Sequence, residues 1–178
     1  MSGKDYLGKV KGERSLLERM MGYVPGYHGY KEKELRRESD RLVRMEAVNR
    51  LKAAKSTMRQ AFANPAMVQK LNGEDAYRYD SLNSRLDRVT QRVDRGVAGY
   101  AGMFDAVKVK EDKLDTVLQS DVNLIEKADG IKTDCEKLAK MQPGNDDWST
   151  AMDTLLSEVE EYDSLIDSRT EVLRGLGQ

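Results

Sequence analysis

Residues that could do chemistry are scarce in this sequence. It contains one histidine, His28, and one cysteine, Cys135, whereas a zinc site needs several ligands of these types. His28 has no Glu three residues before it, so the Glu-x-x-His pair that holds two irons in some helical bundles does not occur. The sequence has neither a phosphate-binding glycine motif nor a nucleophile elbow. These observations predict a protein that uses no metal or cofactor and is not an enzyme.

Cys135 is predicted to be a packing residue. It lies on the apolar stripe of a predicted helix, between Asp134 and Glu136, whereas a reactive thiol requires an electropositive, exposed setting. A single cysteine forms no internal disulfide and suits a reducing compartment. Because no apolar run is long enough to span a membrane, we expect a cytoplasmic protein that is at most peripheral to a membrane.

The most distinctive segment is 22–34, in which three tyrosines are interspersed with glycines and a proline. Proline and glycine fix turns, and each tyrosine offers an apolar ring with a polar tip. Two interpretations stay open: the rings close the end of a bundle and join its first two helices, or they bind a partner together with the arginines that follow. The candidate partner-binding residues are Tyr23, Tyr27, His28, Tyr30, Arg36, Arg37, Arg41 and Arg44.

Basic side chains also recur along the second predicted helix. They lie within about 80° of one another when each residue advances by about 100°. This basic stripe either pairs with an acidic face on the last helix or contacts phosphates of lipid headgroups or nucleic acid. Nucleic acid is the least favoured partner, because no aromatic residue interleaves with the stripe. The basic stripe consists of Arg37, Arg41, Arg44, Lys52, Lys55 and Arg59, and the acidic face of Glu160, Asp163, Asp167 and Glu171.

The charges are unevenly distributed along the chain. The formal net charge is −1, but residues 1–72 carry +8 and residues 106–178 carry −8, with −1 between them. Such polarity favours either an anionic partner for the first part or pairing between the two ends of the chain.

Apolar positions recur at alternating steps of three and four over three long stretches, which start near Tyr79, Leu114 and Trp148. This spacing is typical of helices that pack in a bundle or coiled coil. Turn signals rich in Asn, Pro and Gly separate the helices, and Asn145 or Asp146 suits the cap of the last one. The predicted helices are 6–21, 30–62, 74–98, 111–141 and 146–174.

We therefore predict an all-α fold, an antiparallel bundle of four long helices with a short N-terminal helix. One domain spans 1–178. It comprises an N-terminal helical segment (1–29), a first hairpin (30–98), a connection (99–110) and a second hairpin (111–174). The pattern leaves open whether the helices on the two sides of the connection are continuous, and whether the protein forms a homo-oligomer.

Two charged residues interrupt the apolar stripes of the second hairpin. When the hairpin is folded about its turn, Asp121 and Arg169 fall within one helical turn of each other. We expect them to form an ion pair that fixes the register of the two helices.

Two blocks of the sequence are similar to uncharacterised helical-bundle or predicted coiled-coil proteins of bacteria and archaea. They are 25–44, with a PGYxGYxxKExRR-like pattern, and 99–129, which begins GYAGMFDAVKVK. The resemblance implies a helical bundle and no assigned activity. Because both blocks contain Gly/Tyr-rich connections, it also implies that these two connections meet in space.

These features together favour a non-enzymatic scaffold or protein-interaction module that binds a protein partner. The alternative is a peripheral membrane-associated stress protein, similar in architecture to the phage-shock coiled-coil proteins. That alternative would place the basic stripe and the first helix on anionic lipid. In the first helix, Leu7, Val10 and Leu17 lie near one face and basic residues surround them.

Overall fold

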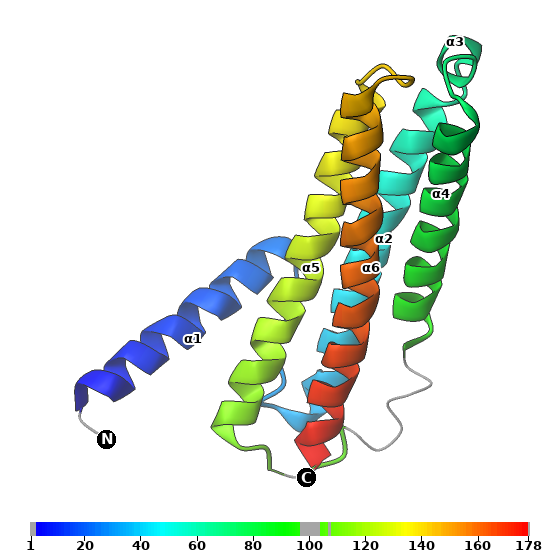
Figure 1. Cartoon of the computed structure of the whole chain (residues 1–178). Coiled ribbons are helices and arrows are strands. Elements are labelled where there is room, and N and C mark those ends of the chain that lie inside the picture. Colours follow the sequence, from blue (N-terminus) through cyan, green and yellow to red (C-terminus); the bar gives the residue numbers. More distant parts are fainter. Residues whose placement is uncertain (1–2, 97–103, 107, 178) are drawn as a thin grey trace.

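The computed structural model describes residues 3–96, 104–106 and 108–177, and the elements it describes are helical (Figure 1). The predicted all-α class is confirmed. No described helix has an apolar stretch that could cross a membrane. The α-helices are α1 (Gly3–Tyr23), α2 (Arg36–Ala61), α3 (Pro65–Val68), α4 (Gly73–Asp94), α5 (Glu111–Ala139) and α6 (Asp146–Arg174), and short 3-10 turns cover Lys33–Leu35 and Gly175–Gly177.

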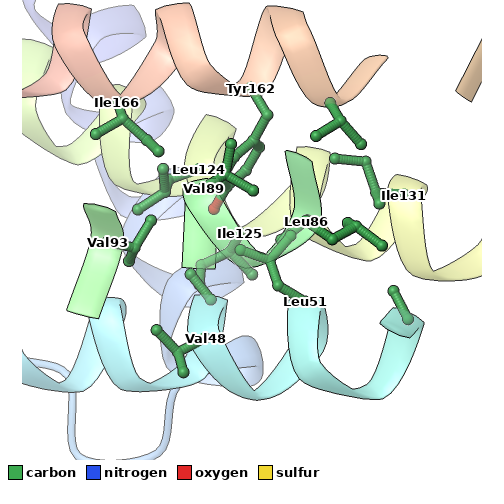
Figure 2. Close-up of a cluster of buried hydrophobic side chains, with 14 of the residues drawn as sticks. Val48, Leu51, Leu86, Val89, Val93, Leu124, Ile125, Ile131, Tyr162 and Ile166 are labelled. Atoms are coloured by element: carbon green, nitrogen blue, oxygen red, sulfur yellow. The ribbon is translucent and has the colours of Figure 1, made fainter. Parts of the chain in front are cut away.

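Four long helices pack side by side around one core. The helices α2 and α4 form one hairpin and α5 and α6 form another; α2 also packs on α5, and α4 on α6 (Figure 1). The helices α2 and α6 therefore lie on opposite corners of the bundle. The apolar residues that meet at its centre come from all four helices (Figure 2): Val48, Leu51, Leu86, Val89, Val93, Leu124, Ile125, Ile131, Tyr162 and Ile166.

The helices of each hairpin are antiparallel, but helices of different hairpins that touch run parallel. Arg78 of α4 pairs with Asp153 of α6, and Arg92 pairs with Asp167. Both pairs are separated by 75 residues, so the two helices advance in the same direction. The prediction of an antiparallel bundle thus holds only within the hairpins, because α4 and α5, which follow one another in the chain, lie at opposite corners of the bundle.

The N-terminal helix is longer than predicted, with 21 residues, and projects obliquely from the bundle (Figure 1). It packs on α5. Met20 and, just beyond the helix, Val24 are buried there, and Arg19 forms an ion pair with Glu126. One face of α1 is therefore fixed to the bundle, whereas Leu7, Val10 and Met21 are exposed.

The helix ends follow the local sequence where a cap is present. Asn72 accepts a hydrogen bond from the backbone N–H of Asp75, and Asn145 accepts one from Trp148, so α4 and α6 start at the predicted places. The second helix begins at Arg36 instead of residue 30, because the chain before it folds as a loop with Gly29 at φ +72°.

The helices on the two sides of the long connection are separate. The fourth helix ends at Asp94 and the fifth begins at Glu111, so the described part of the connection makes no continuous rod. Residues 97–98, which were predicted to end a helix, and 99–103 of the connection lie outside the described residues.

Cys135 is fully buried in α5, as predicted. Burial, together with the nearby carboxylates of Asp134, Glu158 and Glu136, raises the pKa of its thiol to about 12.

Candidate functional site

The tyrosine-rich segment closes one end of the bundle. The side chains of Tyr27 and Tyr30 are 1% and 3% exposed. Their rings meet edge to face at 6.3 Å, and Tyr30 stacks on Phe104 at 6.1 Å. Tyr23 is half-buried; its hydroxyl donates to Glu126 at 3.0 Å, and the guanidinium of Arg50 lies 5.3 Å from its ring. Tyr27 and Tyr30 therefore fit the interpretation in which the rings close the end of the bundle.

Beneath these rings lies a buried polar network. The predicted pair is confirmed: Arg169 of α6 donates to the carboxylate of Asp121 of α5 at 2.8 Å. Arg169 also donates to Asp40 of α2 at 2.8 Å and to the hydroxyl of Tyr30 at 3.1 Å. The hydroxyl of Tyr27 donates to the other oxygen of Asp121 at 2.8 Å.

A second arginine completes this network on α2. Arg44 donates to Asp40 at 2.9 Å and to the backbone carbonyl of Asp94 at 3.1 Å. The sequence did not reveal that Asp40 and Arg44 belong to the network. They are four residues apart, the spacing of a helical ion pair, but that spacing also occurs in many solvated pairs.

Burial dominates the electrostatics of the network. It raises the pKa of Asp121, while Arg169 and the two tyrosine hydroxyls favour its charged form and oppose the rise. It also raises the pKa values of Tyr27 and Tyr30 well above their usual range. These side chains are shielded from solvent and bonded to one another, so the arrangement fixes the register of three helices and a loop.

Arg36 contacts both of the connections that the sequence resemblance predicts to meet, the tyrosine-rich segment and the α4–α5 connection. Its side chain is buried and donates to the backbone carbonyl of Tyr30 at 2.7 Å and to that of Phe104 at 3.3 Å. Next to it, Arg37 lies 3.4 Å from Asp105 and its guanidinium lies 5.9 Å from the Phe104 ring. The described part of the second connection therefore meets the tyrosine-rich segment, as expected.

The predicted partner-binding surface is thus divided between the interior and the surface. Tyr27, Tyr30, Arg36 and Arg44 lie inside the protein, where a partner cannot reach them, and Tyr23 is half-buried. Exposed side chains from the predicted set are His28, Arg37 and Arg41.

The acidic face of α6 does not pair with α2, which corrects one interpretation of the basic stripe. Three of its four carboxylates pair with arginines of α4, because α4 is the neighbour of α6 and α2 lies at the opposite corner; the fourth, Glu171, pairs with Arg174 of α6 itself. The pairs are Arg85 with Glu160, Arg88 with Asp163, and Arg92 with Asp163 and Asp167. Asp153, which lies outside the predicted acidic face, extends the series by pairing with Arg78.

Sequence reasoning missed these arginines of α4, although a signal was present. Positions 78, 85, 88 and 92 have the same spacing as positions 153, 160, 163 and 167. Because the unequal intervals follow in the same order in both helices, the opposite charges meet along the whole series only when the helices run parallel.

Several cations of α2 lie on the side of the helix that faces away from the bundle, between the two sides that contact α4 and α5. Arg41 is bonded to Glu38 at 2.7 Å and Arg37 is near Asp105. Within the described part of the chain, no carboxylate pairs with Lys52 or Arg59. Met45 lies on the same face and is 47% exposed. We call this surface the α2 face; it comprises Arg37, Arg41, Met45, Lys52 and Arg59.

No group of three or more potential metal ligands gathers among the residues that the structure describes. Comparisons of the chain with family models, curated proteins and solved structures found no match. The resemblance of segments 25–44 and 99–129 to bacterial and archaeal helical proteins therefore stays a prediction.

Proposed function

We propose that this protein is a non-enzymatic helical interaction module that binds an acidic partner protein through the α2 face. The observation that carries the proposal is the charge arrangement of the bundle. The acidic residues of α6 are paired with α4. Among the described residues, Lys52 and Arg59 of α2 are therefore left without a carboxylate partner, and Arg37 and Arg41 have one exposed carboxylate each. Positive surface of this kind attracts and orients an acidic partner.

The composition of the α2 face also supports protein binding. Arginine and methionine are enriched in protein interfaces, where lysine is depleted. Arg37, Arg41 and Met45 follow one another at intervals of one helical turn. An exposed methionine between cations supplies an adaptable apolar contact.

The test compares proteins captured from extract of the source cells by three versions of the chain. The α2-face variant is Arg37→Glu/Arg41→Glu; it leaves Arg44 unchanged, because Arg44 is buried and its reversal would disrupt the network. The control variant, Lys137→Glu/Lys140→Glu, makes the same change in charge on exposed residues of another helix end.

We expect the wild type and the control variant to capture the same acidic protein, and the α2-face variant to fail to capture it. The captured protein must then bind the purified wild-type chain directly, with an affinity that falls as salt rises. Equal capture by all three versions, or failure of the purified pair to bind, would overturn the proposal.

Exposed apolar residues on α1 favour a second candidate, peripheral binding to anionic lipid. Leu7 is 61% exposed and Met21 is 53% exposed, and Lys11 and Arg14 are exposed on the same helix. An amphipathic basic helix of this kind can lie in a membrane interface. Cosedimentation with anionic vesicles, but not with neutral ones, and its loss in Leu7→Glu/Val10→Glu would support this candidate; equal recovery from both vesicles would reject it.

A further inference from the structure

A groove runs between α2 and α4, away from the tyrosine-rich end of the bundle. Its volume is about 660 Å³. The charged residues that line it are three cations, Lys52, Lys55 and Arg59, and one carboxylate, Asp87. The neutral residues that line it are Ser56, Gln60, Ala63, Thr90 and Gln91.

The groove has an excess of hydrogen-bond donors that lack an acceptor. Lys55 is neutralised by an ion pair with Asp87, and the hydroxyl of Thr90 donates to the carbonyl of Leu86. In contrast, none of the described residues accepts a bond from the side chains of Lys52, Arg59 or Ser56. The nearest long series of carboxylates, on α6, is paired with α4, so the groove cannot obtain an acceptor from there.

The spacing of these donors fits one compact anion. Lys52, Ser56 and Arg59 are separated by four and three residues, so they lie on one stripe of α2, with a cation about one turn before and one turn after the serine. Serine is short, which leaves room above it. The two long side chains can bend toward that space from opposite ends.

We propose that this groove binds a phosphoryl group seated over Ser56. A phosphate has three acceptor oxygens and up to two negative charges, which suits an ammonium, a guanidinium and a hydroxyl that approach from different directions. A carboxylate is planar with two oxygens and matches this set less well. The groove shares Lys52 and Arg59 with the α2 face, but Arg37 and Arg41 do not line it, so the phosphoryl proposal and the partner proposal can fail separately.

The test follows backbone amide NMR signals of the full chain as inorganic phosphate is added at constant ionic strength. We expect saturable shifts confined to residues 52–60 and 87–91. The Lys52→Gln/Arg59→Gln variant should lose saturable binding, and Arg37→Gln/Arg41→Gln, the matched control on the same helix, should keep it. Ser56→Glu, which places a carboxylate between the two cations, should also abolish the response.

Two arms distinguish the source of the phosphoryl group. Saturable binding of inorganic phosphate without sedimentation on phosphatidic acid vesicles assigns the groove to a soluble phosphate compound. Sedimentation on those vesicles, lost in Lys52→Gln/Arg59→Gln and not seen with phosphatidylcholine, assigns it to a lipid headgroup. Shifts that fail to saturate, that spread over basic residues outside the groove, or that persist in folded Lys52→Gln/Arg59→Gln would overturn the proposal.

Discussion

Arg169 is the residue on which the buried polar network depends. Its guanidinium contacts Asp121 of α5 and Asp40 of α2, and both distances are 2.8 Å. Arg44 also binds Asp40, but no second cation among the described residues is bonded to Asp121. Loss of Arg169 therefore leaves one buried carboxylate without its charged partner, and such a group is costly.

We predict that Arg169→Leu lowers the free energy of unfolding by about 3–5 kcal/mol, the range for a buried ion pair that loses one member. The Asp121→Leu/Arg169→Leu variant should be more stable than the sum of the two single changes implies, because it removes the unpaired charge. Urea denaturation of the four proteins measures both effects. Strict additivity would contradict the role assigned to the pair. Arg174→Leu, which removes an exposed pair with Glu171, is the control and should change little.

Cys135 should be inert toward thiol reagents in the native protein. Its side chain is fully buried, and burial raises the pKa of its thiol to about 12, so almost no thiolate forms at neutral pH. We expect labelling by a disulfide reagent to proceed at the rate of unfolding and to become fast in denaturant. Gly130→Cys/Cys135→Ser, with an exposed thiol on the same helix, should react at once. Equally fast labelling of native Cys135 would show that α5 opens locally.

At the scale of elements, helix boundaries were predicted best where a capping residue directly precedes an apolar stripe. The last helix spans the predicted residues, because Asn145 caps it and the stripe continues to its end. The second helix starts six residues late. It was predicted to start at residue 30, but Gly29 and the burial of Tyr30 under Phe104 draw the chain into a loop. This outcome depends on a contact with a distant segment, which a local pattern cannot report.

The polar network was predicted only in part for the same reason. Asp121 and Arg169 stand out because they interrupt apolar stripes of adjacent helices. Asp40 and Arg44 lie among many charged residues of α2, and nothing local distinguishes them from solvated ones. Their burial follows from the position of α2 beside α5 and diagonal to α6, which comes from the packing of the two hairpins.

The turn between α5 and α6 contacts the short segment between α3 and α4, and one glycine makes this contact feasible. Gly144 has φ +89°, and a Cβ there would lie 2.8 Å from the backbone carbonyl oxygen of Lys70. We predict that Gly144→Ala destabilises the protein by more than about 1 kcal/mol, because it combines strain with a backbone clash. Thermal unfolding measures the change. Gly130→Ala, at an open position inside α5, should be stabilising by up to about 1 kcal/mol; a similar effect of both changes would contradict the argument.

At the scale of the whole molecule, the near-zero net charge hides a defined arrangement. Acids of α6 join the two hairpins by pairing with α4, and acids of α5 pair with Arg19 of α1 and Arg50 of α2. The other cations of the N-terminal half divide into buried ones, such as Arg36 and Arg44, and exposed ones. The positive charge of the N-terminal part is therefore neutralised only in part by the acidic C-terminal part, and one basic face remains on α2.

The buried tyrosines make the stability of the bundle sensitive to alkaline pH. Burial raises the pKa values of Tyr27, Tyr30 and Tyr162 above the usual value, which is about 10 in an unfolded chain. The native state therefore holds these protons more tightly than the unfolded state. This contribution to stability is complete below about pH 10 and is lost as the pH rises toward the native pKa values. Loss of helical circular dichroism should coincide with cooperative ionisation of these tyrosines.

Tyr162 provides the sharpest test of this pH dependence. Its hydroxyl is buried in the core (Figure 2), and no group in the described part of the chain forms a hydrogen bond with it. Tyr162→Phe removes an unsatisfied polar atom and an ionisable group together, so it should leave stability equal or higher at neutral pH and raise the pH at which the protein unfolds. Tyr27→Phe also removes an ionisable group but deprives Asp121 of a bond at 2.8 Å, so it should lower stability at neutral pH. An alkaline midpoint that does not move in Tyr162→Phe would mean that another group, and not the buried core tyrosine, sets the upper pH limit of the fold.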